Sequence, residues 1–174
     1  MRFRALIFDH DKMARKMLWT VLDRRGYEVI AFPDPAACPL HRIPGCPCPA
    51  GQTCADVIIS DLEMPGVRGV KFIARQMAKG CRCKHIALTC AKWADADRAR
   101  ARDLGCKLFA KPLHLSDIYR WLDEVERSTD RDRKLASWSP ISRDSGPPPE
   151  LGVKTAKPSG VHAHSSLDFS PLGS

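Results

Sequence analysis

The stretch VIISDLEMPG, residues 57–66, decides the fold class of this chain. Its apolar start predicts a short strand over residues 56–60, which ends directly before Asp61. A continuous apolar run of this length is typical of a strand whose two faces are both buried. The stretch FRALIF, residues 3–8, has the same character and ends before Asp9. Two such strands favour a parallel sheet that helices cover on both faces.

Strand and helix patterns alternate over the first 126 residues. The predicted strands are short apolar runs at residues 3–8, 27–32, 56–60, 85–89 and 107–110. Helical patterns occupy residues 12–25, 67–80, 94–105 and 117–125. This alternation predicts an α/β fold in which right-handed crossovers connect parallel strands. The connection over residues 33–54 is the exception, because its six prolines exclude a regular helix and predict a loop.

Polar residues stand at the ends of four predicted strands: Asp9, Asp61, Thr89 and Lys111. In an open parallel sheet, ligands bind beyond the carboxyl ends of the strands. Two carboxylates at one sheet edge repel each other, so a divalent cation such as Mg²⁺ would bind between them. An aspartate in such a pocket can act as a nucleophile towards a phosphoryl group, while metal and lysine stabilise the charge in transfer.

Four motifs together resemble the receiver domain of two-component response regulators: LIFDHD (6–11), VIISDLEMPGVRG (57–69), IALTCA (86–91) and KLFAKPL (107–113). The resemblance covers residues 3 to about 126. It implies a flavodoxin-like doubly wound sheet of five parallel strands in the order 2-1-3-4-5. It also implies that Asp61 is the phosphoacceptor, Thr89 the switch hydroxyl and Lys111 the family's lysine, with a cis bond to Pro112.

The same resemblance implies a Mg²⁺ site formed by Asp9, Asp61 and the backbone carbonyl of Glu63. The chain departs from the family at His10, where a second acid is usual. Imidazole suits Mn²⁺ or other transition metals better than Mg²⁺, so His10 or the following Asp11 is the open choice for the remaining ligand.

A second departure concerns the switch aromatic, which the family places three residues before the lysine. That position holds Leu108, with Phe109 beside it on the opposite face of the strand. We therefore expect the surface that signals to partners to respond to Thr89 in a different way from that of family members with the aromatic residue.

A cysteine-rich stretch, CPLHRIPGCPCPAGQTC at residues 38–54, replaces the expected second helix. Thiolates and imidazole at short, turn-rich spacing favour a structural Zn²⁺ site, whose binding energy would help to fold the loop. The candidate ligands are Cys38, His41, Cys46, Cys48, Cys54, Cys81 and Cys83. An iron–sulfur or redox role, and loosely exposed thiols, stay open as alternatives. Cys90 and Cys106 are expected to be small core residues.

Beyond the predicted domain at residues 1–126, residues 127–174 are rich in serine, proline and glycine and predict a disordered tail. The net charge of +8 is spread over several elements and mixed with acids, without any DNA-binding motif. No apolar run approaches the roughly 18–20 residues that span a bilayer. A cytoplasmic location without membrane contact is the resulting expectation.

These observations predict a receiver that accepts a phosphoryl group on Asp61 from a histidine kinase or a phosphotransfer protein. It would signal by docking onto a downstream protein or by passing the phosphoryl group on. Its only enzymatic activity would be its own phosphorylation and slow dephosphorylation. Whether the chain forms a homodimer is left open by the sequence. The alternative is a pseudo-receiver that senses metal or redox state through its cysteines. Hydrolytic catalysis with Glu63 as acid/base is a third, weaker hypothesis.

Overall fold

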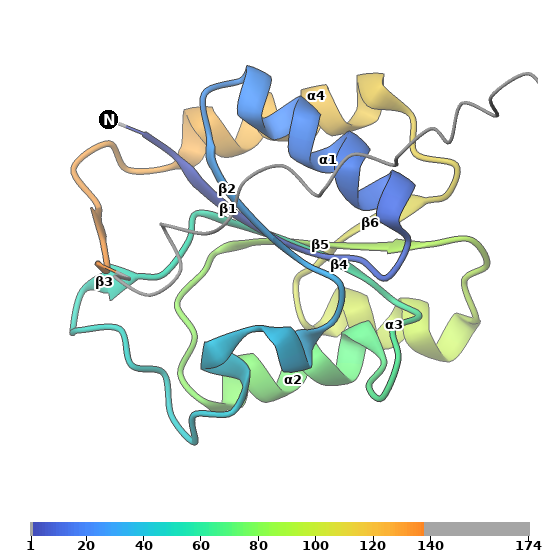
Figure 1. Ribbon diagram of the computed structural model, residues 1–174, viewed down its shortest axis with the longest axis horizontal. Coiled ribbons are helices and arrows are strands. Elements are labelled where there is room, and N and C mark those ends of the chain that lie inside the picture. Colours follow the sequence, from blue (N-terminus) through green and yellow to red (C-terminus); the bar gives the residue numbers. More distant parts are fainter. Residues whose placement is uncertain (1, 138–174) are drawn as a thin grey trace, which may run out of the picture.

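The computed structural model describes residues 2–137, and its centre is a five-stranded parallel sheet (Figure 1). The strands are β1 (Arg4–Phe8), β2 (Glu28–Phe32), β4 (Val57–Asp61), β5 (His85–Cys90) and β6 (Lys107–Ala110). Their order in space is β2-β1-β4-β5-β6. These are the five expected strands in chain order, so the predicted order 2-1-3-4-5 and the α/β class are confirmed.

Helices cover both faces of the sheet, as Figure 1 shows. Helices α1 (Lys12–Arg24) and α4 (Leu115–Ser128) lie on one face, and α2 (Gly69–Ala78) and α3 (Asp95–Asp103) lie on the other. Side chains alternate along β1, so Ile7 joins the core under α1 and α4 while Phe8 joins the opposite core. Within the described residues, no helix has the length and hydropathy of a membrane span.

The connection between β2 and β4 is the loop that the prolines predict. Its regular parts are two single 3-10 turns, η1 (Pro35–Ala37) and η2 (Pro39–His41), and the short strand β3 (Gln52–Thr53). Cys38 and Cys54 are both buried in the core against α2. The loop therefore covers this part of the sheet with its own side chains in place of a helix.

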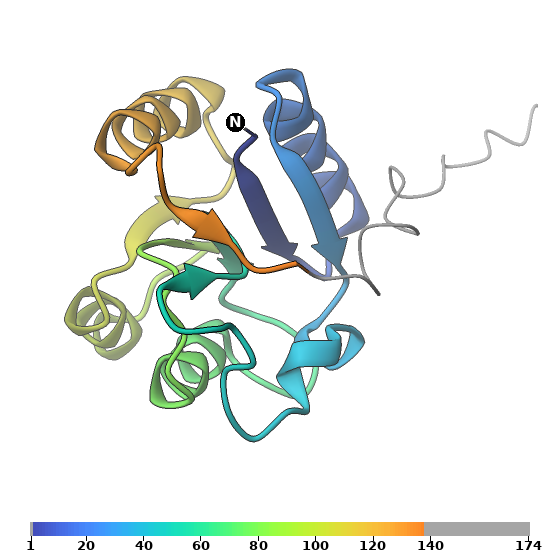
Figure 2. The ribbon, with the colours of Figure 1, turned by 90° about the vertical axis from the view of Figure 1, so that its left-hand side faces the viewer.

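The predicted start of the disordered tail at residue 127 is wrong. Helix α4 continues to Ser128, and the chain then returns across the amino-terminal edge of the sheet to form β7 (Lys134–Leu135) (Figure 2). Strand β7 pairs in parallel with β3, and Arg133 forms an ion pair with the buried Asp56. A two-residue strand has no periodicity of its own, and its partner lies about eighty positions earlier, so a local pattern does not reveal it. The rest of the predicted tail, residues 138–174, lies outside the described residues.

Candidate functional site

The four polar residues at the strand ends lie together at the carboxyl edge of the sheet. Asp61 ends β4 and lies opposite Thr89 of β5 in the strand register. The ammonium of Lys111, just after β6, lies 3.0 Å from Asp9 Oδ2 and 3.1 Å from Asp61 Oδ1. Both carboxylates are almost completely buried, at 1% and 3% exposure. The predicted convergence of these residues is confirmed.

Charge in this pocket is only partly balanced. Burial raises the pKa of Asp9, although the Lys111 ammonium opposes the shift. Burial also acts to lower the pKa of Lys111, but the charges of Asp9 and Asp61 outweigh it and the pKa is raised. One ammonium thus faces two carboxylates, which leaves room for further positive charge.

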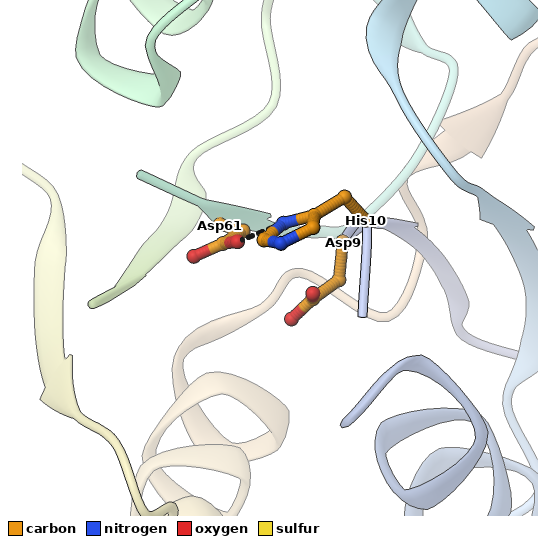
Figure 3. Close-up of side chains that lie close together, drawn as sticks. All are labelled: Asp9, His10 and Asp61. Atoms are coloured by element: carbon orange, nitrogen blue, oxygen red, sulfur yellow. Dashed lines mark hydrogen bonds and ion pairs between the residues drawn. The ribbon is translucent and has the colours of Figure 1, made fainter. Parts of the chain in front are cut away.

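His10 reaches the pocket from the turn after β1. Its Nδ1–H donates a hydrogen bond to Asp61 Oδ2 over 2.8 Å, and its side chain is about half exposed at 49% (Figure 3). In the described part of the chain, Asp9, His10 and Asp61 are the one group of three or more His, Cys, Asp or Glu side chains whose ligand atoms all lie within 4.8 Å of one another. The departure at His10 therefore lies inside the predicted metal site.

Asp11, the other open choice, is used elsewhere. Its side chain accepts hydrogen bonds from the backbone N–H groups of Met13 and Ala14 and so caps α1. These backbone hydrogen bonds lower the pKa of Asp11. Asp11 also lies outside the group of ligand atoms that Asp9, His10 and Asp61 bring together.

The residues present fit a divalent cation. Two buried carboxylates supply the oxygen ligands that Mg²⁺ and Mn²⁺ prefer. The imidazole of His10 shifts the donor set towards Mn²⁺ and similar ions. Glu63 follows β4 and is exposed, and its backbone carbonyl as a ligand stays a prediction.

Thr89 carries the most unusual polar atom of the site. Its side chain is fully buried, and Oγ1 has no hydrogen-bond partner among the described residues. A buried hydroxyl without a partner costs about 1–3 kcal/mol. The hydroxyl is therefore available to a ligand oxygen that enters the pocket.

The two residues of the second departure lie on different sides of β6. Phe109 is buried on the α4 face, where its ring packs at 5.7 Å against that of Trp121 in a T-shaped arrangement. Leu108 is partly buried and packs against the opposite core. The bond between Lys111 and Pro112 is cis, as the resemblance implies.

Two residues that the sequence pattern does not single out also shape the site. A Cβ on Gly69 would lie 2.3 Å from the carbonyl oxygen of Asp61, so only glycine lets α2 begin this close to β4. Arg15 donates to the carbonyl oxygen of Asp9 over 2.5 Å and fixes the turn that carries His10. Gly69 stands at the start of a helical pattern, which could have indicated a close approach of the backbone. Arg15 has no such signal, because it resembles any other surface cation of α1.

The seven candidate zinc ligands divide into two groups, and the first lies around the starts of β4 and β5, at the amino-terminal edge of the sheet. Thiol contacts join Cys46 to Cys48, Cys48 to Cys54, and Cys54 to Cys81. The contact between Cys54 and Cys81 lowers the pKa of the Cys81 thiol and raises that of the Cys54 thiol. Cys54 and Cys81, which precede β4 and β5, therefore meet at this edge.

The other three candidates have different surroundings. Cys83 is buried and donates to the carbonyl oxygen of His85, and the ring of His41 packs at 5.7 Å against Phe72. Cys38 is buried in the core beside the loop. Cys90 and Cys106 are buried as well, as expected of core residues.

Comparison with known proteins agrees with this architecture. The family model of the response regulator receiver domain matches residues 5–123. The CheY4 chemotaxis protein of Vibrio cholerae is similar in structure, with 23% identity, a TM-score of 0.56, and 72% of this chain and 99% of that chain covered. The receiver domain of the Francisella response regulator 1452 gives 17% identity, a TM-score of 0.59, and coverage of 74% and 100%. A receiver protein from Pseudomonas putida gives 20% identity, a TM-score of 0.59, and coverage of 71% and 98%.

No curated protein sequence matches. Because the family model spans more than half of the chain, this protein belongs to the family of response regulator receiver domains.

Proposed function

We propose that this receiver is a switch controlled by phosphorylation of Asp61. The observation that carries the proposal is the position of Lys111, whose ammonium bridges Asp61 and Asp9 in a buried pocket beside the unpartnered hydroxyl of Thr89. A structural role alone does not require a buried carboxylate pair that shares one cation, because such an arrangement is costly to bury.

In the proposed reaction, an oxygen of Asp61 forms a bond to phosphorus while the bond from phosphorus to the donor's histidine nitrogen breaks. The donor imidazole leaves with the electron pair of that bond, and the product is an acyl phosphate. A divalent cation held by Asp9 and Asp61 would neutralise charge on the phosphoryl oxygens, with His10 as a further ligand where that ion is Mn²⁺. Lys111 supplies a second, permanent positive charge next to the same oxygens.

Both oxygens of Asp61 have partners before the reaction. Oδ1 lies beside Lys111, and Oδ2 accepts the hydrogen bond from His10. One of these contacts must open before Asp61 can attack. His10 is the more exposed partner, at 49% compared with 20% for Lys111, so it is the group that moves.

Thr89 would convert phosphorylation into a change of shape. A phosphoryl oxygen on Asp61 offers the hydrogen-bond acceptor that the Thr89 hydroxyl lacks. Movement of Thr89 towards it would repack the end of β5 and the surface formed by α3, β6 and α4. A switch of this kind needs two states that differ by only a few kcal/mol.

The partners follow from this chemistry. A histidine kinase or a phosphotransfer protein would supply the phosphoryl group, and a downstream protein or a relay partner would recognise the result. The chain itself would then be no enzyme beyond its own phosphorylation and slow dephosphorylation. A cytoplasmic location belongs to the same proposal, because all eight cysteines are free thiols, as is usual in a reducing compartment.

The test is phosphorylation by a small-molecule donor. Wild-type protein and the Asp61→Asn variant are incubated with acetyl phosphate and either Mg²⁺ or Mn²⁺, and intact mass is followed over time. We expect a phosphoryl adduct on the wild type alone, formed faster with Mn²⁺. Tryptophan fluorescence with beryllofluoride gives an independent measure of binding to Asp61. The absence of an adduct and of a fluorescence response with either metal would favour the pseudo-receiver alternative.

A further inference from the structure

The thiols of Cys46, Cys48, Cys54 and Cys81 form an open ring at the amino-terminal edge of the sheet. Side-chain contacts run from Cys46 to Cys48, on to Cys54 and then to Cys81. The ends of this row also meet through the backbone. A Cβ on Gly80, the residue before Cys81, would lie 4.0 Å from Cys46 Cβ. The N–H of Cys46 donates to the carbonyl oxygen of Lys79 over 2.8 Å, which holds this junction.

The four thiols come from three separate segments of the chain. Cys46 and Cys48 belong to the proline-rich loop, Cys54 lies between β3 and β4, and Cys81 follows α2. Four sulfurs from three segments are unnecessary for a buried core, since the neighbouring Cys38 and Cys83 already fill that role as buried side chains. Cys46, Cys48 and Cys81 are only partly buried, so an ion from solvent has access to the ring.

We propose that Cys46, Cys48, Cys54 and Cys81 bind one thiophilic divalent cation of the zinc class as a closed tetrathiolate site. Four sulfur ligands suit the tetrahedral preference of Zn²⁺ and are poor ligands for Mg²⁺. These four cysteines are a subset of the seven candidate ligands that the sequence predicts. His41 is directed to Phe72, and Cys83 donates to the carbonyl oxygen of His85.

Binding requires the ring to tighten. Zn–S bonds of about 2.3 Å place the sulfurs of a tetrahedral site about 3.8 Å apart. Within the described residues, the thiols do not yet form a set whose sulfurs all lie within 4.8 Å. Residues 42–45, 47, 49 and 50 of the loop are exposed, which leaves the chain room to close this gap.

Two cationic side chains donate hydrogen bonds to the backbone of the loop. The guanidinium of Arg82 donates to the carbonyl oxygen of Pro49, and the ammonium of Lys79 donates to that of His41. Both cations therefore lie against the loop that carries Cys46 and Cys48. Four thiolates and Zn²⁺ leave two negative charges, which these side chains offset.

The site would fasten the loop to the body of the domain. Over residues 42–50, the backbone hydrogen bonds that the structure records are those of Cys46 and Pro49. A tetrathiolate would tie this segment to the end of α2 and to the base of β4. The energy of metal binding then becomes folding energy.

The test is metal binding by reduced, full-length protein. Zinc content is measured after purification, and Co²⁺ is then titrated into the metal-free form while sulfur-to-cobalt charge-transfer absorption is recorded. That absorption separates thiolate ligation from binding at Asp9, His10 and Asp61, where no sulfur is present. We expect about one zinc per chain and an intense thiolate–cobalt band in the wild type.

Variants complete the design. Cys48→Ser and Cys46→Ser change partly exposed loop residues, and we expect each to weaken Co²⁺ or Zn²⁺ binding at least tenfold. Cys106→Ser, between α3 and β6, is the control for loss of a thiol outside the ring, and Asp61→Asn removes a ligand of the other cation site. Both should show the same thiolate–cobalt band as the wild type. A reduced protein without the thiolate–cobalt band, an equal loss in Cys106→Ser, or a Cys54–Cys81 disulfide that forms equally with and without zinc would each overturn the proposal.

Discussion

Replacing His10 by aspartate should strengthen Mg²⁺ binding at the carboxyl edge of the sheet. His10 donates to Asp61 Oδ2 over 2.8 Å, so this contact competes with a cation for the same oxygen. The substitution removes the competing donor and adds a carboxylate beside Asp9 and Asp61. Imidazole is at the same time a better ligand for Mn²⁺ than for Mg²⁺, so the wild type should prefer Mn²⁺ more strongly than the variant does.

The expected magnitude follows from the hydrogen bond. A hydrogen bond to a charged group contributes about 1.5–3 kcal/mol, and the half-exposed side chain of His10 places this one near the lower end. Removing 1.5 kcal/mol of competition corresponds to about a tenfold lower Kd. The attraction between the new carboxylate and a divalent cation adds to this gain, and repulsion from Asp9 and Asp61 reduces it. We therefore expect Mg²⁺ to bind about 10- to 100-fold more tightly.

The assay is titration of the wild type and the variant with Mg²⁺ and with Mn²⁺. Binding is measured by calorimetry and by tryptophan fluorescence. Trp93 is a suitable reporter, because its indole N–H donates to the carbonyl oxygen of Phe109 two residues before Lys111. His10→Ala is the control, since it removes the donor without adding charge, and it should capture the tenfold part alone. An unchanged or higher Kd for Mg²⁺ in His10→Asp would refute the competition argument. Weaker Mg²⁺ binding in His10→Ala would show that the imidazole is a ligand and not a competitor.

Three further substitutions test other parts of the structure by urea denaturation. Gly69→Ala should lower the free energy of unfolding by about 1–3 kcal/mol, because its Cβ would lie 2.3 Å from the carbonyl oxygen of Asp61; an unchanged value would contradict the close approach of α2. Thr89→Val should leave the unfolding free energy equal or higher by about 1 kcal/mol, since it removes a buried hydroxyl without a partner, while the fluorescence response to beryllofluoride is lost. Arg133→Ala should cost about 3 kcal/mol by leaving the buried Asp56 carboxylate without its ion pair, and a cost below about 0.5 kcal/mol would mean that β7 does not hold the domain together.

Much of the fold was predictable because each strand ends at a polar residue. The apolar runs before Asp9 and Asp61 fixed two strands, and the parallel topology then required their ends to meet at one edge. The same topology required Cys54 and Cys81, which precede their strands, to meet at the opposite edge. Both convergences are observed.

The parts that escaped prediction depend on contacts between distant and locally featureless segments. Strand β7 forms only because β3 lies beside it and because Asp56 offers Arg133 a buried partner. The bond from His10 to Asp61 depends on the path of the turn after β1, which Arg15 and the cap at Asp11 define. Neither feature produces a periodic pattern in the sequence. The sequence therefore does not reveal the contacts that His10 and Arg133 make.

The two edges of the sheet should serve separate purposes. Cys54 precedes β4 and Asp61 ends it, so the length of β4, about 13 Å, separates them. Strand β4 is buried along its whole length between them, so it forms a rigid spacer and not a hinge. Perturbations more than about 10 Å apart without shared partners usually have additive effects on stability. A metal at the thiol ring would therefore raise the stability of the domain without changing the equilibrium between the states that Thr89 and His10 govern. The thiol ring lies at the edge of the sheet opposite Asp61 and Lys111, so the cysteine-rich loop can take the place of a helix without altering the site of the proposed phosphorylation.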